Sequence, residues 1–324
     1  MSKAIVIHET GGPEVLHWEE HNPGEPAPGE VRLVHEAVGL NFIDVYFRTG
    51  LYPLPSLPAV IGMEGAGIVD KVGEGVTELK EGDRVAYAGV LGAYAQVRCI
   101  PADRLVPLPD AISTHDAAGM MLQGMTARYL LKGCYPVGPG TTLLITAAAG
   151  GVGSILCQWA KHLGATVLGL VGSEEKAETA RKNGCDHPIL YREVDFVAAV
   201  RELTNGEGVD VAYDSVGQAT FLKMLDCVRP MGTIVPFGQS SGDIEPFDLR
   251  LLSSKGSLFL TRPSLMDYTR KREDLLAHAK DLFDVVTAGV VTMRIMQEYP
   301  LSDVPQAHRD MEGRKTRGST VLIP

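Results

Sequence analysis

A short run of small residues has the spacing in this chain that is best suited to chemistry. Ala148, Gly150 and Gly153 form the pattern small-x-Gly-x-x-Gly, with alanine in place of the usual first glycine. The pattern follows the apolar run 142–146 and precedes the amphipathic run 154–163. Small residues let a strand turn tightly into a helix, so that backbone N–H groups approach a pyrophosphate at the positive helix end. The segment therefore predicts a bound dinucleotide; a turn that only packs the helix on its sheet is the alternative.

The next predicted strand, 166–171, indicates which dinucleotide binds. It ends in Gly172–Ser173, without the acidic residue that usually binds the ribose 2′-OH of NAD. Lys176 lies in the first turn of the following helix, where a cation opposes the helix dipole unless an anion binds beside it. Tyr191–Arg192, after the third strand, could close the same corner. This favours a 2′-phosphate, and so NADPH, although Glu174–Glu175 leave open that Lys176 only balances these two acids.

The elements that must hold these residues alternate strictly between strand and helix from about residue 124 onward. Such alternation predicts a parallel sheet with helices on both faces, the doubly wound Rossmann architecture. The predicted strands cover 142–146, 166–171, 188–190, 209–214 and 233–237, and the predicted helices cover 154–163, 174–183, 195–203 and 218–227.

Residues 1 to about 122 have a different pattern. They are rich in glycine and proline, and short runs such as 31–38, 65–73 and 83–87 are bounded by turn signals. This predicts a compact, mainly antiparallel β barrel or sandwich, with a proline-rich loop at 52–58. A final strand at 319–323 is expected to return to it. The fold class is therefore α/β with two domains.

Composition excludes several classes of function. The 324 residues carry 30 Lys+Arg against 40 Asp+Glu, a net charge of −10, which argues against nucleic acid and anionic membrane as partners. No stretch reaches the roughly 18 apolar residues of a membrane span, and the start is too short for a signal peptide. The five scattered cysteines are typical of reduced thiols in a cytoplasmic protein.

Seven segments in order along the chain carry a family resemblance. They lie at 41–46, 62–67, 82–85, 123–127, 147–153, 213–217 and 256–263. Together they resemble the medium-chain dehydrogenase/reductase superfamily, specifically the zinc-independent quinone oxidoreductases related to zeta-crystallin. The resemblance implies a GroES-like catalytic domain from 1–123 and 266–324, a Rossmann domain at 124–265, and a homodimer formed through the Rossmann sheet edge.

The resemblance also implies site residues. Tyr46 and Tyr52 would line the quinone site, and Gln123 stands where many relatives have lysine, which puts a polar contact there in doubt. The NADPH contacts would fall on Asn41, Thr126, Gly150, Gly151, Val152, Gly172, Ser173, Lys176, Tyr191, Ser215, Phe237, Ser240 and Arg314.

A catalytic metal is not expected. The zinc-binding members of the resembled superfamily carry a Gly-His-Glu motif and an early cysteine, whereas this chain has Met63 and Asn41 or its neighbours at those places. Thioether and amide groups are poor zinc ligands. The nine histidines show no paired metal spacing, and no cluster of four cysteines is present for a structural zinc.

Quinone reduction asks mainly for positioning and for a hydrogen-bond donor to the developing oxyanion. Asn41 and Tyr46 are the candidate donors, because amide N–H and phenol O–H groups stay protonated at neutral pH. Asn41 as a helix N-cap, and Tyr46 and Tyr52 as packing residues, remain open alternatives. The rival activity is an enoyl or 2-alkenal reductase, and a non-catalytic binding role is a further class. The physiological quinone and one- or two-electron transfer stay undecided.

Overall fold

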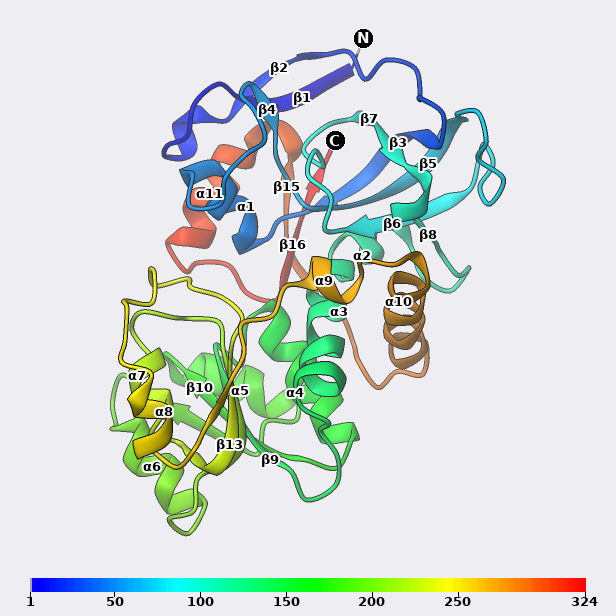
Figure 1. The fold of residues 1–324 in the computed structure, drawn as a ribbon. Helices are drawn as coiled ribbons and strands as arrows, with labels where there is room; N and C mark the ends of the chain where they lie inside the picture. Colours follow the sequence, from blue (N-terminus) through cyan, green and yellow to red (C-terminus); the bar gives the residue numbers. More distant parts are fainter. Residues whose placement is uncertain (1) are drawn as a thin grey trace. The chain divides into compact units, whose positions relative to one another are not determined.

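The computed structural model describes residues 2–324, and these form two compact units. The first unit contains residues up to Met125 together with Thr269–Thr287 and Met293–Pro324, and takes the blue and cyan parts of Figure 1 with the orange helix α10 and the orange-red to red C-terminal part. The second contains Thr126–Tyr268 and Ala288–Thr292, largely the green and yellow parts.

The first unit is built on two sheets. A seven-stranded sheet has the order β15-β16-β3-β5-β6-β8, with β7 paired to β3, and a three-stranded sheet has the order β2-β1-β4. All pairs are antiparallel except β15 with β16. The strands are β1 (Ser2–Ile7), β2 (His17–His21), β3 (Glu30–Gly39), β4 (Ala59–Val60), β5 (Glu64–Val72), β6 (Arg84–Ala88), β7 (Val97–Pro101), β8 (Val106–Pro107), β15 (Ile295–Pro300) and β16 (Ser319–Ile323).

Helices and one apolar core complete this unit. The core includes Leu33, Val69, Val85 and Ile100 from the larger sheet, and Ile5 from the smaller one, all buried. The helices are α1 (Phe42–Thr49), α2 (Thr114–Ala118), α3 (Met121–Tyr129, which continues into the second unit), α10 (Arg272–Thr287) and α11 (Val304–Glu312).

The second unit is a doubly wound parallel sheet. Its strand order is β11-β10-β9-β12-β13-β14, and every pair is parallel. In chain order this is 3-2-1-4-5-6, which places the carboxyl ends of β9 and β12 next to each other at the point where the order reverses. The strands are β9 (Thr142–Thr146), β10 (Thr166–Val171), β11 (His187–Leu190), β12 (Val209–Asp214), β13 (Val228–Pro236) and β14 (Phe259–Leu260).

The helices of this unit follow the predicted alternation, with one exception. They are α4 (Gly151–His162), α5 (Glu174–Lys182), α6 (Phe196–Leu203), α7 (Phe221–Met224), α8 (Arg250–Ser254) and α9 (Leu265–Tyr268), and a π-helical turn (Leu130–Cys134) follows α3. The prediction of a helix over 218–227 was wrong in length, because α7 has only four residues.

Strand β13 also begins five residues earlier than predicted. Its pairing with β12 jumps from Val209↔Val228 to Val211↔Thr233, so the residues around Pro230 and Gly232 form a bulge within the strand. Throughout residues 2–324, no helix combines the length and the apolar character needed to cross a membrane.

Candidate functional site

The turn between β9 and α4 is as tight as its small residues predict. Ala147 has a positive φ of 50°, and Gly150 is the N-cap of α4, donating its N–H to the Ala147 carbonyl at 2.8 Å. A Cβ at Gly153 would lie 2.2 Å from the Ala147 oxygen, a distance at which no side chain fits. The free N–H groups at the start of this 12-residue helix therefore suit a pyrophosphate.

The end of β10 gathers the residues expected at a 2′-phosphate. A Cβ at Gly172 would lie 3.5 Å from the Tyr191 hydroxyl and 3.4 Å from Arg192 Nε, so both side chains reach this glycine. Ser173 is the N-cap of α5, and its Oγ accepts from the Lys176 N–H at 3.4 Å. Three predicted cofactor residues, Gly172, Ser173 and Tyr191, thus lie together at one strand end, and Lys176 lies one helical turn away.

The side chain of Lys176 keeps its charge available. Glu174 pairs with Arg181 at 2.7 Å, so it is not held by Lys176. Between residues 2 and 324, no hydrogen bond or ion pair engages the Lys176 ammonium group. This geometry weakens the alternative in which Lys176 serves only to balance the acids before it.

The carboxyl ends of β9, β12 and β13 are tied together around Asp214. This buried carboxylate accepts from Thr220 Oγ1 at 2.8 Å, from Thr146 Oγ1 at 3.1 Å and from the N–H groups of residues 216 and 217. Burial raises the pKa of Asp214, although these donors oppose the shift. Thr146 Oγ1 also accepts from the Ser215 N–H at 2.8 Å, and the Ser240 N–H donates to the Ser215 carbonyl.

Asp214 therefore fixes the loop that carries Ser215 and, through it, Ser240. Phe237 directly follows β13, and its N–H donates to the Asp214 carbonyl. Three predicted cofactor residues are thus arranged at the switch point of the sheet. No role for Asp214 was expected from the sequence. Thr126, also a predicted contact, is buried on α3.

Asn41 in the first unit has one hydrogen-bond partner on each of its two side-chain polar atoms. It occupies the N-cap of α1, and its backbone N–H donates to Asp44 Oδ2 at 2.9 Å. Its side-chain Nδ2 donates to Glu64 Oε2 at 2.6 Å, and its Oδ1 accepts from Gln123 Nε2 at 3.3 Å. Glu64 Oε1 accepts from the N–H of Leu122 at 2.7 Å. The N-cap alternative is therefore correct for its position, and the amide has further partners.

Two fully buried carboxyl groups lie beside Asn41. Burial raises the pKa of Glu64 to about 8, with the negative charge of Asp44 adding to the shift and hydrogen bonds from Asn41 and α3 opposing it. Burial likewise raises the pKa of Asp44 to about 7, against hydrogen bonds from Asn41 and Tyr94. Perturbed carboxyl groups of this kind cluster at functional sites.

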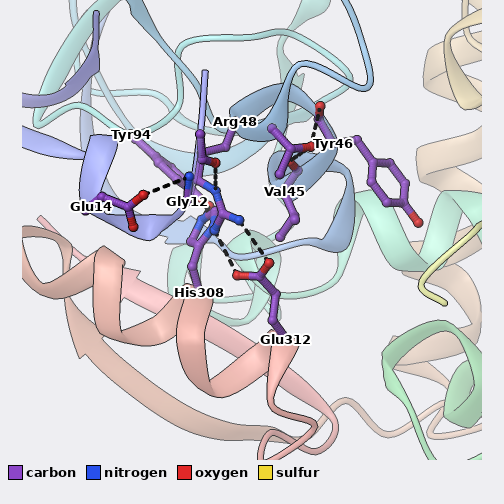
Figure 2. A network of polar contacts seen from close by, with 10 residues as sticks. Gly12, Glu14, Val45, Tyr46, Arg48, Tyr94, His308 and Glu312 are labelled. Carbon is purple, nitrogen blue, oxygen red and sulfur yellow. Dashed lines mark hydrogen bonds and ion pairs between the residues drawn. The ribbon is translucent and has the colours of Figure 1, made fainter. Parts of the chain in front are cut away.

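Tyr46 and Tyr52 lie together, as the predicted site requires. Their ring centroids are 5.2 Å apart, and the Tyr52 N–H donates to the Tyr46 carbonyl at 3.0 Å. Phe42 and Phe47 pack on the two rings, so both tyrosines also have a packing role. Figure 2 shows the Tyr46 ring directed away from the polar network on the opposite side of α1.

That network was not expected from the sequence. Arg48, buried in α1, donates to both oxygens of Glu312 at 2.9 Å and to His308 Nδ1 at 3.0 Å (Figure 2). His308 Nε2 contacts the Tyr94 hydroxyl at 3.0 Å, and that hydroxyl donates to Asp44 Oδ2 at 2.8 Å. Burial and the Arg48 charge lower the pKa of His308 to about 3, so this histidine is neutral.

The network joins α1 to α11, whose end carries the predicted cofactor contact Arg314. Arg314 follows the helix by two residues and has a positive φ of 59°, an unusual conformation for a non-glycine residue. Asn41, Tyr46, Tyr52 and Arg314 all belong to the first unit, whereas the other predicted contacts belong to the second.

Met63 stands where the zinc-binding members of the resembled superfamily have a histidine, and it is buried in the core of the first unit. Across the described part of the chain, no group of three or more His, Cys, Asp or Glu residues is placed to hold a metal ion.

The parallel sheet with its glycine turn, together with the β-rich first unit, defines a dinucleotide-dependent oxidoreductase. Two family models match the chain: an alcohol dehydrogenase GroES-like domain over residues 27–110 and a zinc-binding dehydrogenase over residues 151–281.

Full-length relatives narrow the class. Quinone oxidoreductase 1 of Escherichia coli K12 is 48% identical over 327 residues, and the alignment covers all of both chains. A 2-haloacrylate reductase from a Burkholderia species is also 48% identical, covering 100% of this chain and 99% of the relative. The crystal structure of the E. coli quinone oxidoreductase complexed with NADPH matches with a TM-score of 0.97, at 48% identity, over 99% of this chain and 100% of that one.

The chain belongs to the quinone oxidoreductases of the medium-chain dehydrogenase/reductase superfamily. The family and the α/β fold class predicted from the sequence are confirmed.

Proposed function

We propose that the protein reduces quinones with NADPH. The observation that carries the proposal is the full-length match to an NADPH-bound quinone oxidoreductase, together with a β9–α4 turn that a single Cβ at Gly153 would block. NADPH supplies a hydride when it is bound. The residues of the second unit that we assign to it form three groups: the turn at 150–152, the corner of Gly172, Ser173, Lys176 and Tyr191, and the strand ends at Ser215, Phe237 and Ser240. Thr126, Asn41 and Arg314 complete the set.

The chain's own contribution is to hold the acceptor and to stabilise the oxygen that gains negative charge. Asn41 Nδ2 carries two hydrogens, and one of them is donated to Glu64 in a hydrogen bond. The other, with the Tyr46 hydroxyl, is proposed to donate to the quinone oxygen, while the paired rings of Tyr46 and Tyr52 hold the planar substrate. The oxygen that gains negative charge then takes one proton from solvent, so that one hydride and one proton together convert the quinone to the hydroquinone.

We propose that no metal takes part. The support is the chemistry of the residues at the positions concerned: Met63 offers a thioether inside an apolar core, and the Asn41 amide is held by Glu64 and Gln123. Elemental analysis of active protein, with catalysis retained after dialysis against a chelator, tests this. Stoichiometric zinc that is lost together with activity would overturn it.

The 2-haloacrylate reductase, equal in identity to the quinone oxidoreductase, favours a second candidate: reduction of an activated carbon–carbon double bond. Initial rates of NADPH oxidation with 1,2-naphthoquinone, a crotonyl thioester, a 2-alkenal and 2-chloroacrylate would separate the two. A kcat/KM for the quinone at least tenfold above the others supports quinone reduction, and the reverse order supports the second candidate.

Tyr46→Phe tests the donor role directly. We expect kcat with the quinone to fall and the KM for NADPH to stay nearly constant, because only an interaction with the reacting oxygen is removed. Tyr299→Phe, which also removes a hydroxyl of the first unit, is the matched control. An unchanged kcat in Tyr46→Phe removes this residue from the mechanism.

We also propose a homodimer and a cytoplasmic location. Strand β14 is an edge of the parallel sheet, and Phe259 on it is 63% exposed, beside the 65% exposed Met231, whose N–H donates to the Gly256 carbonyl. Sedimentation of Phe259→Asp, with the similarly exposed Leu222→Asp as control, should show a monomer for the first variant only.

The cysteines support the cytoplasmic location: all five are free, which suits a reducing compartment.

A further inference from the structure

A chain of buried side-chain hydrogen bonds leads from the last strand to Asn41. Ser319 Oγ on β16 donates to Gln123 Oε1 at 2.9 Å, and Gln123 Nε2 on α3 donates to Asn41 Oδ1 at 3.3 Å. Asn41 Nδ2 in turn donates to Glu64 Oε2 on β5 at 2.6 Å. All four residues are buried; three come from separate elements, and Asn41 is the N-cap of α1.

The direction of this chain decides how the Asn41 amide faces. An amide carries a donor on nitrogen and an acceptor on oxygen, so each amide in the chain fixes the orientation of the next. If Asn41 alone turned by 180° while Glu64 is ionised, its oxygen would meet the Glu64 carboxylate and its nitrogen would meet the nitrogen of Gln123. Both contacts are repulsive in a buried site, where an unsatisfied polar group is costly.

Only a reversal of the whole chain satisfies every partner in the other orientation. It needs a donor at Glu64, which the protonated carboxyl provides, and it turns both Asn41 and Gln123. The Ser319 hydroxyl then accepts instead of donating, which a hydroxyl can do. Reversal exchanges nitrogen and oxygen of Asn41 and so moves its second N–H group to the other side of the amide.

We propose that Gln123 and Ser319 are positioning residues for the reaction, which with Glu64 hold the Asn41 amide with its free N–H toward the quinone oxygen. The inference rests on the donor role of Asn41 in the proposed function. Gly39 makes the arrangement possible, because a Cβ there would lie 2.3 Å from Glu64 Oε2.

A double-mutant cycle tests the proposal. Ser319→Ala removes one oxygen and should lower kcat with the quinone by roughly two- to tenfold, the fold-change expected for one buried hydrogen bond. In the Asn41→Ala background, Ser319→Ala should cause no further loss, because the two side chains act through one another. Thr320→Val is the matched control: it removes a buried hydroxyl from the same strand, but one bonded to Gln297, and kcat should not change.

The outcomes separate this inference from the proposed function. If Asn41→Ala leaves kcat unchanged, the donor role fails, and the positioning role fails with it. If Asn41→Ala lowers kcat but Ser319→Ala has no effect, or an equal effect in both backgrounds, the donor role stands and the positioning role is overturned.

Glu64→Gln gives a second, independent test, because we expect this variant to fold normally, so that a change in kcat reports the orientation of Asn41. The new amide keeps the shape of Glu64, with its oxygen available to Leu122 and its nitrogen facing Asn41. It therefore forces the reversed chain of hydrogen bonds. At pH 9, above the raised pKa of about 8, the wild-type Glu64 is ionised, so kcat should fall more than in Ser319→Ala while urea denaturation shows no loss of stability. A stable Glu64→Gln protein with wild-type kcat at pH 9 would overturn the proposal.

Discussion

Removing the hydroxyl of Tyr94 should destabilise the protein more than the loss of a single oxygen atom suggests. Tyr94 is fully buried, and its hydroxyl bridges Asp44 and His308 in the network of Figure 2. Tyr94→Phe keeps the ring, including its edge contact with His308 at 5.9 Å, and removes only the bridging oxygen.

The magnitude follows from what each partner can do afterwards. Arg48 can only donate, so His308 Nδ1 must be the acceptor and Nε2 must carry the proton. The His308 ring therefore cannot change tautomer, so its Nε2–H group is left without a hydrogen-bond partner in Tyr94→Phe. This costs about 1–3 kcal/mol. Asp44 loses the Tyr94 hydroxyl as a donor and keeps the N–H of Asn41. We expect the free energy of unfolding to fall by about 2–4 kcal/mol in total.

Urea denaturation followed by circular dichroism measures this loss, with Tyr299→Phe as control. The Tyr299 hydroxyl also bonds a carboxylate, Asp310, at 3.0 Å, but Tyr299 is only half-buried, so that variant should lose less than about 1 kcal/mol. The loss in Tyr94→Phe should also be larger at pH 8 than at pH 6, because Asp44, with its pKa raised to about 7, is ionised only at the higher pH. Equal losses in the two variants would refute the reasoning.

Three further predictions address the cofactor site and the buried carboxyls. Lys176→Ala should raise the KM for NADPH about tenfold or more and leave that for NADH nearly unchanged, because a charge-assisted bond of roughly 1.5–3 kcal/mol is lost; equal effects on both cofactors would contradict it. Gly153→Ala should abolish NADPH binding in calorimetry, since its Cβ would meet the Ala147 oxygen at 2.2 Å; wild-type affinity would contradict the tight turn. The stability that Glu64 contributes should be present at pH 4.5 and lost as the pH rises to about 8, because its raised pKa makes the folded state bind the proton more tightly than the unfolded state. Glu64→Gln should remove this part of the pH dependence in urea denaturation at pH 5 and pH 9, and an unchanged dependence would count against it.

The parallel sheet could be predicted because its signals are local. Strands 142–146, 166–171 and 209–214 have the predicted bounds in the structure, and each is a largely buried run next to a turn or a helix. The failures occur where tertiary context decides. Strand β13 continues across Pro230 and Gly232 because its partner strand accommodates a bulge, and neither residue signals this by itself.

The polar network of the first unit could not be predicted, because its partners are far apart in the sequence. Arg48 and Glu312 are separated by 264 residues, and Tyr94 and His308 by 214. In a helix such as α1, an arginine is expected at the surface, and only tertiary packing brings a carboxylate to it. The buried hydrogen bonds of Asp44 to Asn41 and Tyr94 give this carboxyl a structural role in the network.

These two networks meet at the N-terminus of α1, and this explains why such costly groups are buried there. Asp44 and Glu64 both have pKa values raised by burial, and an apolar pair would avoid that cost. The carboxyls, however, take the backbone N–H and the side-chain Nδ2 of the same residue, Asn41. One network continues through Tyr94, His308 and Arg48 to Glu312, two residues before Arg314. The two networks therefore lower stability while they fix the positions of Asn41 and Arg314, two predicted cofactor contacts of the first unit. Buried polar groups that cost stability are expected at such functional positions.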